Sequence, residues 1–139
     1  MSYVIKAEIR DARAPTFTFV AQKTMYGGKQ VSVGDEIFLF ASENEGGIGL
    51  VGAGIITSAA ATPRRLGLAR QTPSVTITVR RTALATHAIG RSQLRQFDDW
   101  DDDLHETELN FKLYRQATNK VVGISPSAAA FLRQCMAAK

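Results

Sequence analysis

The sequence has few of the features that mark secreted, membrane-bound or disulfide-stabilised proteins. Its 139 residues include one cysteine, Cys135, which cannot form an internal disulfide and suits a reducing compartment. No apolar run approaches the ~20 residues of a membrane-spanning helix. The first residues show neither the basic leader nor the apolar core of a signal peptide. These absences predict a cytoplasmic protein without a membrane partner.

Charge of one sign is missing from two parts of the chain. Between Gly46 and Phe97 there is no Asp, Glu or Lys, yet this stretch holds seven arginines. Residues 98–108 hold seven of the 13 acidic residues and no Lys or Arg. The arginines suit a solvated basic surface, but planar guanidinium groups also match phosphate oxygens and stack on bases. We therefore expect affinity for nucleic acid or another polyanion, and the predicted phosphate-binding residues are Arg64, Arg65, Arg70 and Lys120.

Motifs for catalysis, metal binding and nucleotide binding are also missing. Gly47, Gly49 and Gly52 spell GxGxxG, but they run into a segment that favours a strand, and no acidic residue follows about twenty positions on. The acidic run lacks the Gly and Glu of a calcium loop. His87 and His105 have no neighbouring ligands in a zinc pattern. We expect no catalytic residue, no cofactor and no metal, and we expect the glycines to let a strand bend or approach another backbone.

Alternation of apolar and polar residues predicts that most of the chain forms short strands. These are expected at 3–9, 16–19, 36–41, 48–57, 75–80, 109–116 and 120–124. The segment Ile37–Ala41 is apolar on both faces, so it should be a central strand flanked by 48–57. The residues Ala117-Thr118-Asn119 indicate a hairpin between the last two strands.

Helical signals are few and lie towards the C-terminus. Ser92 suits the N-cap of a short turn. Ser125 suits the N-cap of a final helix that has Pro126 in its first position and runs to Met136. Together the patterns predict one α+β, mostly β domain over residues 1–139. We expect a curved sheet or small barrel with peripheral short helices and a C-terminal helix.

Trp100 is the only tryptophan, and it lies inside the acidic run. An aromatic side chain in a polar loop either covers the core or forms one wall of a ligand cage. Tyr26, Phe40 and Trp100 are the candidates for such a cage, which would stack on a flat or methylated group. Core packing is the alternative for each of them.

Two stretches resemble the central signature of EVE domains. Residues Lys29–Ser42 place a Gly-Asp turn before an apolar strand, and the glycine-rich residues Gly46–Gly54 follow. The ending Val122-Gly123-Ile124-Ser125-Pro126, before a final helix, is similar to that of the family. The resemblance covers most of 1–60 and 108–139. It implies a PUA-like barrel, related to YTH and ASCH domains.

The resemblance also implies a binding role. Such domains are associated with RNA or with modified bases in DNA or RNA, held in a pocket between the barrel and its loops. By position, the family's pocket corresponds in this sequence to Gln22, Lys23, Tyr26, Phe40 and Ser42.

The first interpretation is a non-catalytic module that binds single-stranded or base-flipped nucleic acid, with a pocket for one extruded base, modified bases included. The three cage aromatics would stack on that base, and Gln22 and Ser42 would read its polar edges. Lys23 and Lys120 would join the arginines in holding phosphates.

A second interpretation is a small-molecule or protein-interaction domain that uses the same pocket, with the acidic run docking a basic partner. A third is an ASCH-like nucleoside amidohydrolase, for which Lys23 and Glu43 are the only lysine–carboxylate pair to nominate.

Overall fold

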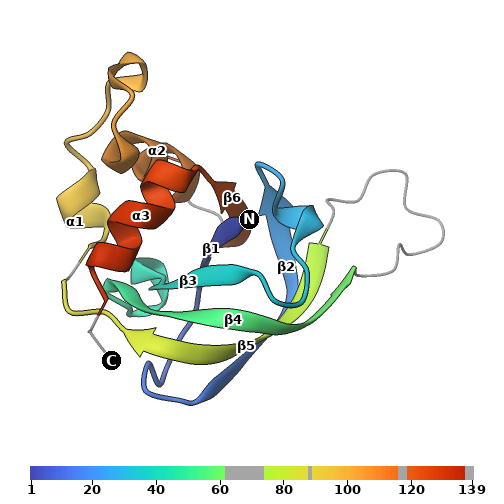
Figure 1. Ribbon diagram of the computed structural model, residues 1–139. Coiled ribbons are helices and arrows are strands. Elements are labelled where there is room, and N and C mark those ends of the chain that lie inside the picture. The colour runs from blue at the N-terminus through green and yellow to red at the C-terminus, as the bar shows by residue number, and fades with distance from the viewer. Residues whose placement is uncertain (62–73, 88, 116–118, 137–139) are drawn as a thin grey trace.

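A closed β-barrel forms the body of the protein (Figure 1). The computed structural model describes residues 1–61, 74–87, 89–115 and 119–136. Within these ranges, six strands follow one another around the barrel in the order β1-β3-β4-β5-β2-β6. They are β1 (Ser2–Ala7), β2 (Thr16–Met25), β3 (Glu36–Ala41), β4 (Gly49–Ala61), β5 (Ser74–Leu84) and β6 (Lys120–Ile124).

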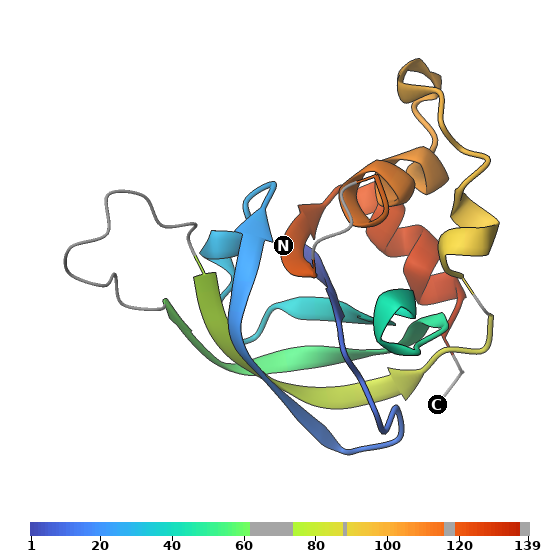
Figure 2. The ribbon, with the colours of Figure 1, turned by 180° about the vertical axis from the view of Figure 1, so that it is seen from behind.

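Short helices lie outside the barrel and gather on one side of it in both views (Figures 1 and 2). The α-helices of the described segments are α1 (Arg91–Leu94), α2 (His105–Leu113) and α3 (Pro126–Gln134). Single 3-10 turns are η1 (Gly28–Gln30), η2 (Glu43–Glu45) and η3 (Trp100–Asp102). This arrangement confirms the predicted mostly β fold with peripheral helices. None of the described helices is long and apolar enough to cross a membrane.

Strand β3 is central, as its two apolar faces predict. It pairs in parallel with β1 and antiparallel with β4. Because neighbouring residues of a strand point to opposite faces, Ile37 and Leu39 fill the barrel while Phe38 and Phe40 point outward. All four side chains are fully buried. Strand β3 is therefore buried on both faces, by the barrel interior on one side and by the helices on the other.

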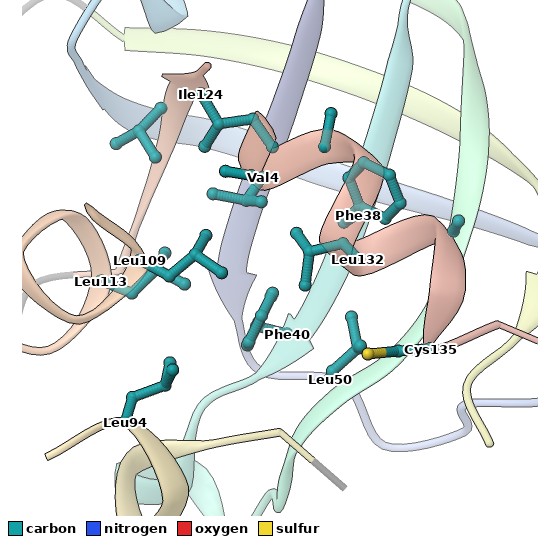
Figure 3. Packing of buried hydrophobic residues seen from close by; sticks show 14 residues of the cluster. Val4, Phe38, Phe40, Leu50, Leu94, Leu109, Leu113, Ile124, Leu132 and Cys135 are labelled. Atoms are coloured by element: carbon teal, nitrogen blue, oxygen red, sulfur yellow. The ribbon is translucent and has the colours of Figure 1, made fainter. Parts of the chain in front are cut away.

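The two faces of the sheet belong to two separate hydrophobic clusters. Inside the barrel, the inward residues of the strands pack together, among them Tyr3, Ile5, Ile56, Ile77 and Val121. Outside it, Phe38 and Phe40 pack beneath the helices with Leu109, Leu113 and Leu132 (Figure 3). The second cluster fixes the helical layer on the barrel.

The C-terminal helix begins where the sequence predicts. The Ser125 hydroxyl accepts a hydrogen bond from the Ala128 amide at 3.2 Å, and Pro126 occupies the first turn. Leu132 and Cys135 are buried on the apolar face of the helix. The cap and the apolar face together explain why this helix could be read from the sequence.

The predicted strand at 109–116 is wrong, because residues 105–113 form the helix α2. Leu109, Phe111 and Leu113 alternate with polar residues, which mimics a strand. Leu109 and Leu113 are also four residues apart, and the helix buries both of them against the outer cluster. Phe111 instead points towards Trp100, with ring centres 4.8 Å apart. The predicted hairpin therefore lacks its first strand, and its turn residues Ala117 and Thr118 lie outside the described residues.

The GxGxxG glycines lie in or beside strand β4, so the prediction that they permit close backbone contact is confirmed. Gly49 has φ +95°, and a Cβ atom there would lie 2.3 Å from the Ile89 carbonyl oxygen. The next amide, Leu50 N, donates to that same oxygen at 2.7 Å. A Cβ on Gly52 would lie 2.6 Å from the carbonyl oxygen of Ala83 on β5. These glycines let two segments touch β4 where no side chain would fit.

Candidate functional site

An open cleft of about 680 Å³ lies at one end of the barrel. Its walls are the end of β1, the middle of β2, the η2 turn and the residue before β6. The lining residues are Ala7, Glu8, Arg10, Thr18, Phe19, Val20, Ala21, Gln22, Lys23, Asn44, Glu45 and Asn119. The volume is in the range of pockets that hold a small molecule or a single base.

The cleft exists because strand β6 is short. On one side, β6 pairs with Ser2–Lys6 of β1, and on the other side it pairs only with Lys23–Met25 of β2. Beyond these pairs, strands β1 and β2 continue without a described strand between them. The barrel wall therefore opens between Ala7 and the middle of β2, and side chains from both strands border the opening.

The cleft offers hydrogen-bonding groups of every kind. Gln22, Asn44 and Asn119 carry amides that both donate and accept. Lys23 is an exposed cation, and the Arg10 guanidinium is held by Glu8 at 2.5 Å. Such a set can contact the polar edge of a base and the phosphate beside it.

Three lysines lie level with one another next to the cleft. In the strand register, Lys120 of β6 lies opposite Lys6 of β1 on one side and opposite Lys23 of β2 on the other. Directly opposed residues project from the same face of a sheet. Lys23 is exposed at the cleft, whereas Lys6 and Lys120 are almost completely buried. Only Lys23 of the three is among the residues that line the cleft.

Burial lowers the pKa of both Lys6 and Lys120. Desolvation and then the charge of Lys6 lower the pKa of Lys120 to about 8. Desolvation is also the main cause that lowers the pKa of Lys6, and Arg91 adds to it. The Lys6 ammonium donates to the Leu113 carbonyl oxygen at 2.6 Å, where helix α2 ends and its dipole is negative. This bond gives Lys6 a structural role in holding α2 on the barrel.

A set of buried oxygen atoms lies near the start of η2. Ser42 Oγ has no hydrogen-bond partner among the described residues, and the Glu43 carboxylate and the Tyr114 hydroxyl interact with each other. The other carboxylate oxygen of Glu43 accepts from the Arg91 amide at 2.7 Å. Burial, followed by the charge of Glu43, raises the pKa of Tyr114. Unpaired buried polar atoms are uncommon and mark positions where a further group could bind.

The structure brings only some of the predicted pocket residues together. Gln22 and Lys23 line the cleft. Ser42 is buried at the base of η2. Tyr26 is 43% exposed, and its ring lies against the Lys112 ammonium at 5.1 Å from the ring centre. Phe40 is fully buried beneath the helices, so the predicted cage lacks an accessible ring at this position.

Trp100 lines a different cleft. It is 61% exposed on η3 and packs edge-on against Phe111. This second cleft, of about 440 Å³, shares no residue with the first; its walls are Trp100, Asp102, Asp103, Leu104, Thr107, Glu108, Ser125 and Ser127. The indole is therefore neither a core plug nor a wall of the cleft that contains Lys23.

The predicted phosphate-binding residues have different outcomes. Arg64, Arg65 and Arg70 lie outside the described residues, so their role stays a prediction. Lys120 is buried, so it cannot bind phosphate at the surface as predicted. In the strand register it lies opposite Lys23.

Several cleft residues were not predicted from the sequence. Glu8 and Arg10 follow the first strand, and Asn44 and Glu45 form the η2 turn. In the sequence, nothing distinguishes either pair from ordinary polar residues at the protein surface. The only signal was that polar residues follow two strands, β1 and β3, which pair in parallel and so end at the same edge of the barrel.

No family model matches the sequence, and neither does any curated protein. Solved structures do match its fold. The DUF55 domain of human thymocyte nuclear protein 1 is 11% identical with a TM-score of 0.64, over 96% of this chain and 97% of that one. A protein from Pseudomonas putida is 16% identical with a TM-score of 0.65, over 97% and 99%.

A third match is the human THYN1 protein in complex with 5-methylcytosine-containing DNA. It is 12% identical with a TM-score of 0.61, over 96% of this chain and 95% of that one. The protein therefore shares its fold with these three structures. The resemblance stated from the sequence is confirmed at the level of the fold.

Proposed function

We propose that the protein is a non-catalytic nucleic-acid-binding module that holds one extruded base, modified bases included, in the cleft beside Lys23. The observation that carries the proposal is the cleft itself: amide groups and cations line one opening of the barrel that is large enough for a base. The match to the fold of the human protein solved with 5-methylcytosine-containing DNA supports it further.

Each side chain has a role that suits its chemistry. Lys23 and Arg10 contact the phosphates that flank the extruded base, because they are the cations that line the cleft. Gln22 and Asn44 donate to and accept from the polar edge of the base. Glu45 accepts from an exocyclic amine, the group that distinguishes cytosine and adenine from thymine and uracil. Phe19 supplies apolar surface at the base of the cleft.

The alternative of an amidohydrolase needs a lysine and a carboxylate that meet in one site. The nominated carboxylate, Glu43, accepts from the Arg91 amide and lies near Tyr114. Among the described residues, no ion pair joins Glu43 to Lys23, and Glu43 is not among the residues that line the cleft. The nominated lysine and carboxylate therefore do not share one site, so we propose binding as the function.

Replacing Lys23 by alanine should weaken binding to a single-stranded oligonucleotide of about 12 nucleotides that carries one 5-methylcytosine. Loss of one phosphate contact should flatten the plot of log K against log salt by about 0.7. Fluorescence anisotropy at several salt concentrations measures both effects. The matched control is Lys29→Ala, because Lys29 is also exposed but does not line the cleft.

Two outcomes would contradict the proposal. The first is a wild-type protein that binds neither DNA nor RNA at low salt. The second is equal weakening by Lys23→Ala and Lys29→Ala, which would indicate a diffuse basic surface. Oligonucleotide binding that does not depend on salt would show that the cleft contacts no phosphates, because no counterions are then released.

A further inference from the structure

The wall of the cleft contains a β-bulge in strand β2. Phe19 lies opposite Ile77 of β5, and Gln22 lies opposite Val75. Val20 and Ala21 together therefore face the single residue Thr76, which is the arrangement of a bulge. The extra residue interrupts the alternation of inward and outward side chains. The sequence therefore predicted an end at residue 19, whereas the strand continues to Met25.

Two hydrogen bonds hold the bulge in place. The Ala21 amide donates to the Thr76 hydroxyl at 3.0 Å, and the Gln22 side-chain amide donates to the Val20 carbonyl oxygen at 3.0 Å. Ala21 has φ +50°, a left-handed conformation that is uncommon for residues with a Cβ atom. Bulges and strained residues of this kind concentrate beside functional sites.

The extra residue changes which side chains reach the cleft. Before the bulge Phe19 is buried inside the barrel, and after it the buried residue is Thr24. In a regular strand residues of odd number would continue inward, and Lys23 would point into the barrel. The bulge therefore turns Lys23 outward to the cleft, level with Lys120.

The same bulge exposes an apolar side chain among polar ones. Val20 is 67% exposed and lines the cleft. A single exposed valine is ordinary on a protein surface. Val20 differs in that its backbone is held by the hydrogen bonds of the bulge, and it stands at an opening that otherwise presents amides and charges. A valine is also stiff about χ1, so holding it against a ligand loses little entropy.

We propose that Val20 is a wedge: it enters the gap in a duplex that an extruded base leaves, while the base itself lies beside Lys23. This inference rests on the proposed function. Apolar side chains inserted between base steps replace part of the lost stacking and favour the opened duplex. A wedge is needed only on a duplex, because a single strand has no paired stack to hold open.

The test compares Val20→Ala with Val33→Ala. Val33 is a matched control because it is 66% exposed and lies outside the cleft. The probes are a duplex of about 12 base pairs with one central 5-methylcytosine, and its methylated strand alone. Val20→Ala should weaken duplex binding about five-fold or more and weaken single-strand binding clearly less. Val33→Ala should change neither affinity, and both variants should keep the wild-type melting temperature.

The outcomes separate the wedge from the function on which it rests. If Val20→Ala leaves duplex binding unchanged, or weakens duplex and single strand equally, the wedge is overturned while nucleic-acid binding stands. If the wild-type protein binds neither probe, the proposed function fails, and the wedge fails with it.

Discussion

Replacing Phe38 by alanine should lower the free energy of unfolding by about 3–5 kcal/mol. Phe38 is fully buried on the central strand, where its ring fills the space between the barrel and the helices (Figure 3). Removing it leaves a cavity between two layers that are each fixed by their own hydrogen bonds, so the space cannot easily close. Chemical denaturation followed by circular dichroism measures the loss.

Phe17→Ala is the matched control for this substitution. Phe17 is only half-buried on β2 and stacks on Phe19, with ring centres 5.9 Å apart. The same change of side chain there should have a clearly smaller effect. A loss below about 1 kcal/mol for Phe38→Ala would mean that β3 is not the centre of the core.

Gly49→Ala should destabilise the protein by about 2–5 kcal/mol, or prevent folding. Two effects add at this position. A residue with a Cβ atom at φ +95° is strained by roughly 1–2 kcal/mol. The new methyl would also lie 2.3 Å from the Ile89 carbonyl oxygen and 2.6 Å from Gly90 Cα, and both are backbone atoms that cannot move aside alone.

Gly34→Ala separates the two effects. Gly34 has φ +94°, but a Cβ atom there would have no neighbour within 4 Å. This variant should show the conformational strain alone, about 1–2 kcal/mol. Equal losses for the two variants, measured by thermal unfolding, would show that the close contact between β4 and the segment before α1 is unimportant.

The fold could be predicted from local patterns wherever burial and periodicity agree. Residues 37–41 are apolar on both faces, as expected of a strand that is covered on both sides. Ser125 and Pro126 mark a helix start independently of the rest of the chain. Helix α2 was missed because its apolar residues fit a period of two as well as a period of four, and only the tertiary packing of Leu109 and Leu113 decides between them.

The candidate site was harder to predict because its residues come from distant parts of the chain. Gln22 and Lys23 were found through the EVE resemblance, and the structure places both in the cleft. Asn44 and Asn119 reach the same cleft only because the barrel closes. Lys23 itself faces the cleft through a bulge, and no periodic pattern predicts an extra residue in a strand.

The most direct test of the central claim is to map the binding surface by nuclear magnetic resonance. Amide signals of the protein are followed while a single strand that carries 5-methylcytosine is added. We predict that the largest shifts occur in the cleft, at residues 19–23, 44–45 and 119. The indole signal of Trp100, in the second cleft, should not move. Shifts that gather around Trp100 while residues 19–23 stay unchanged would contradict the account.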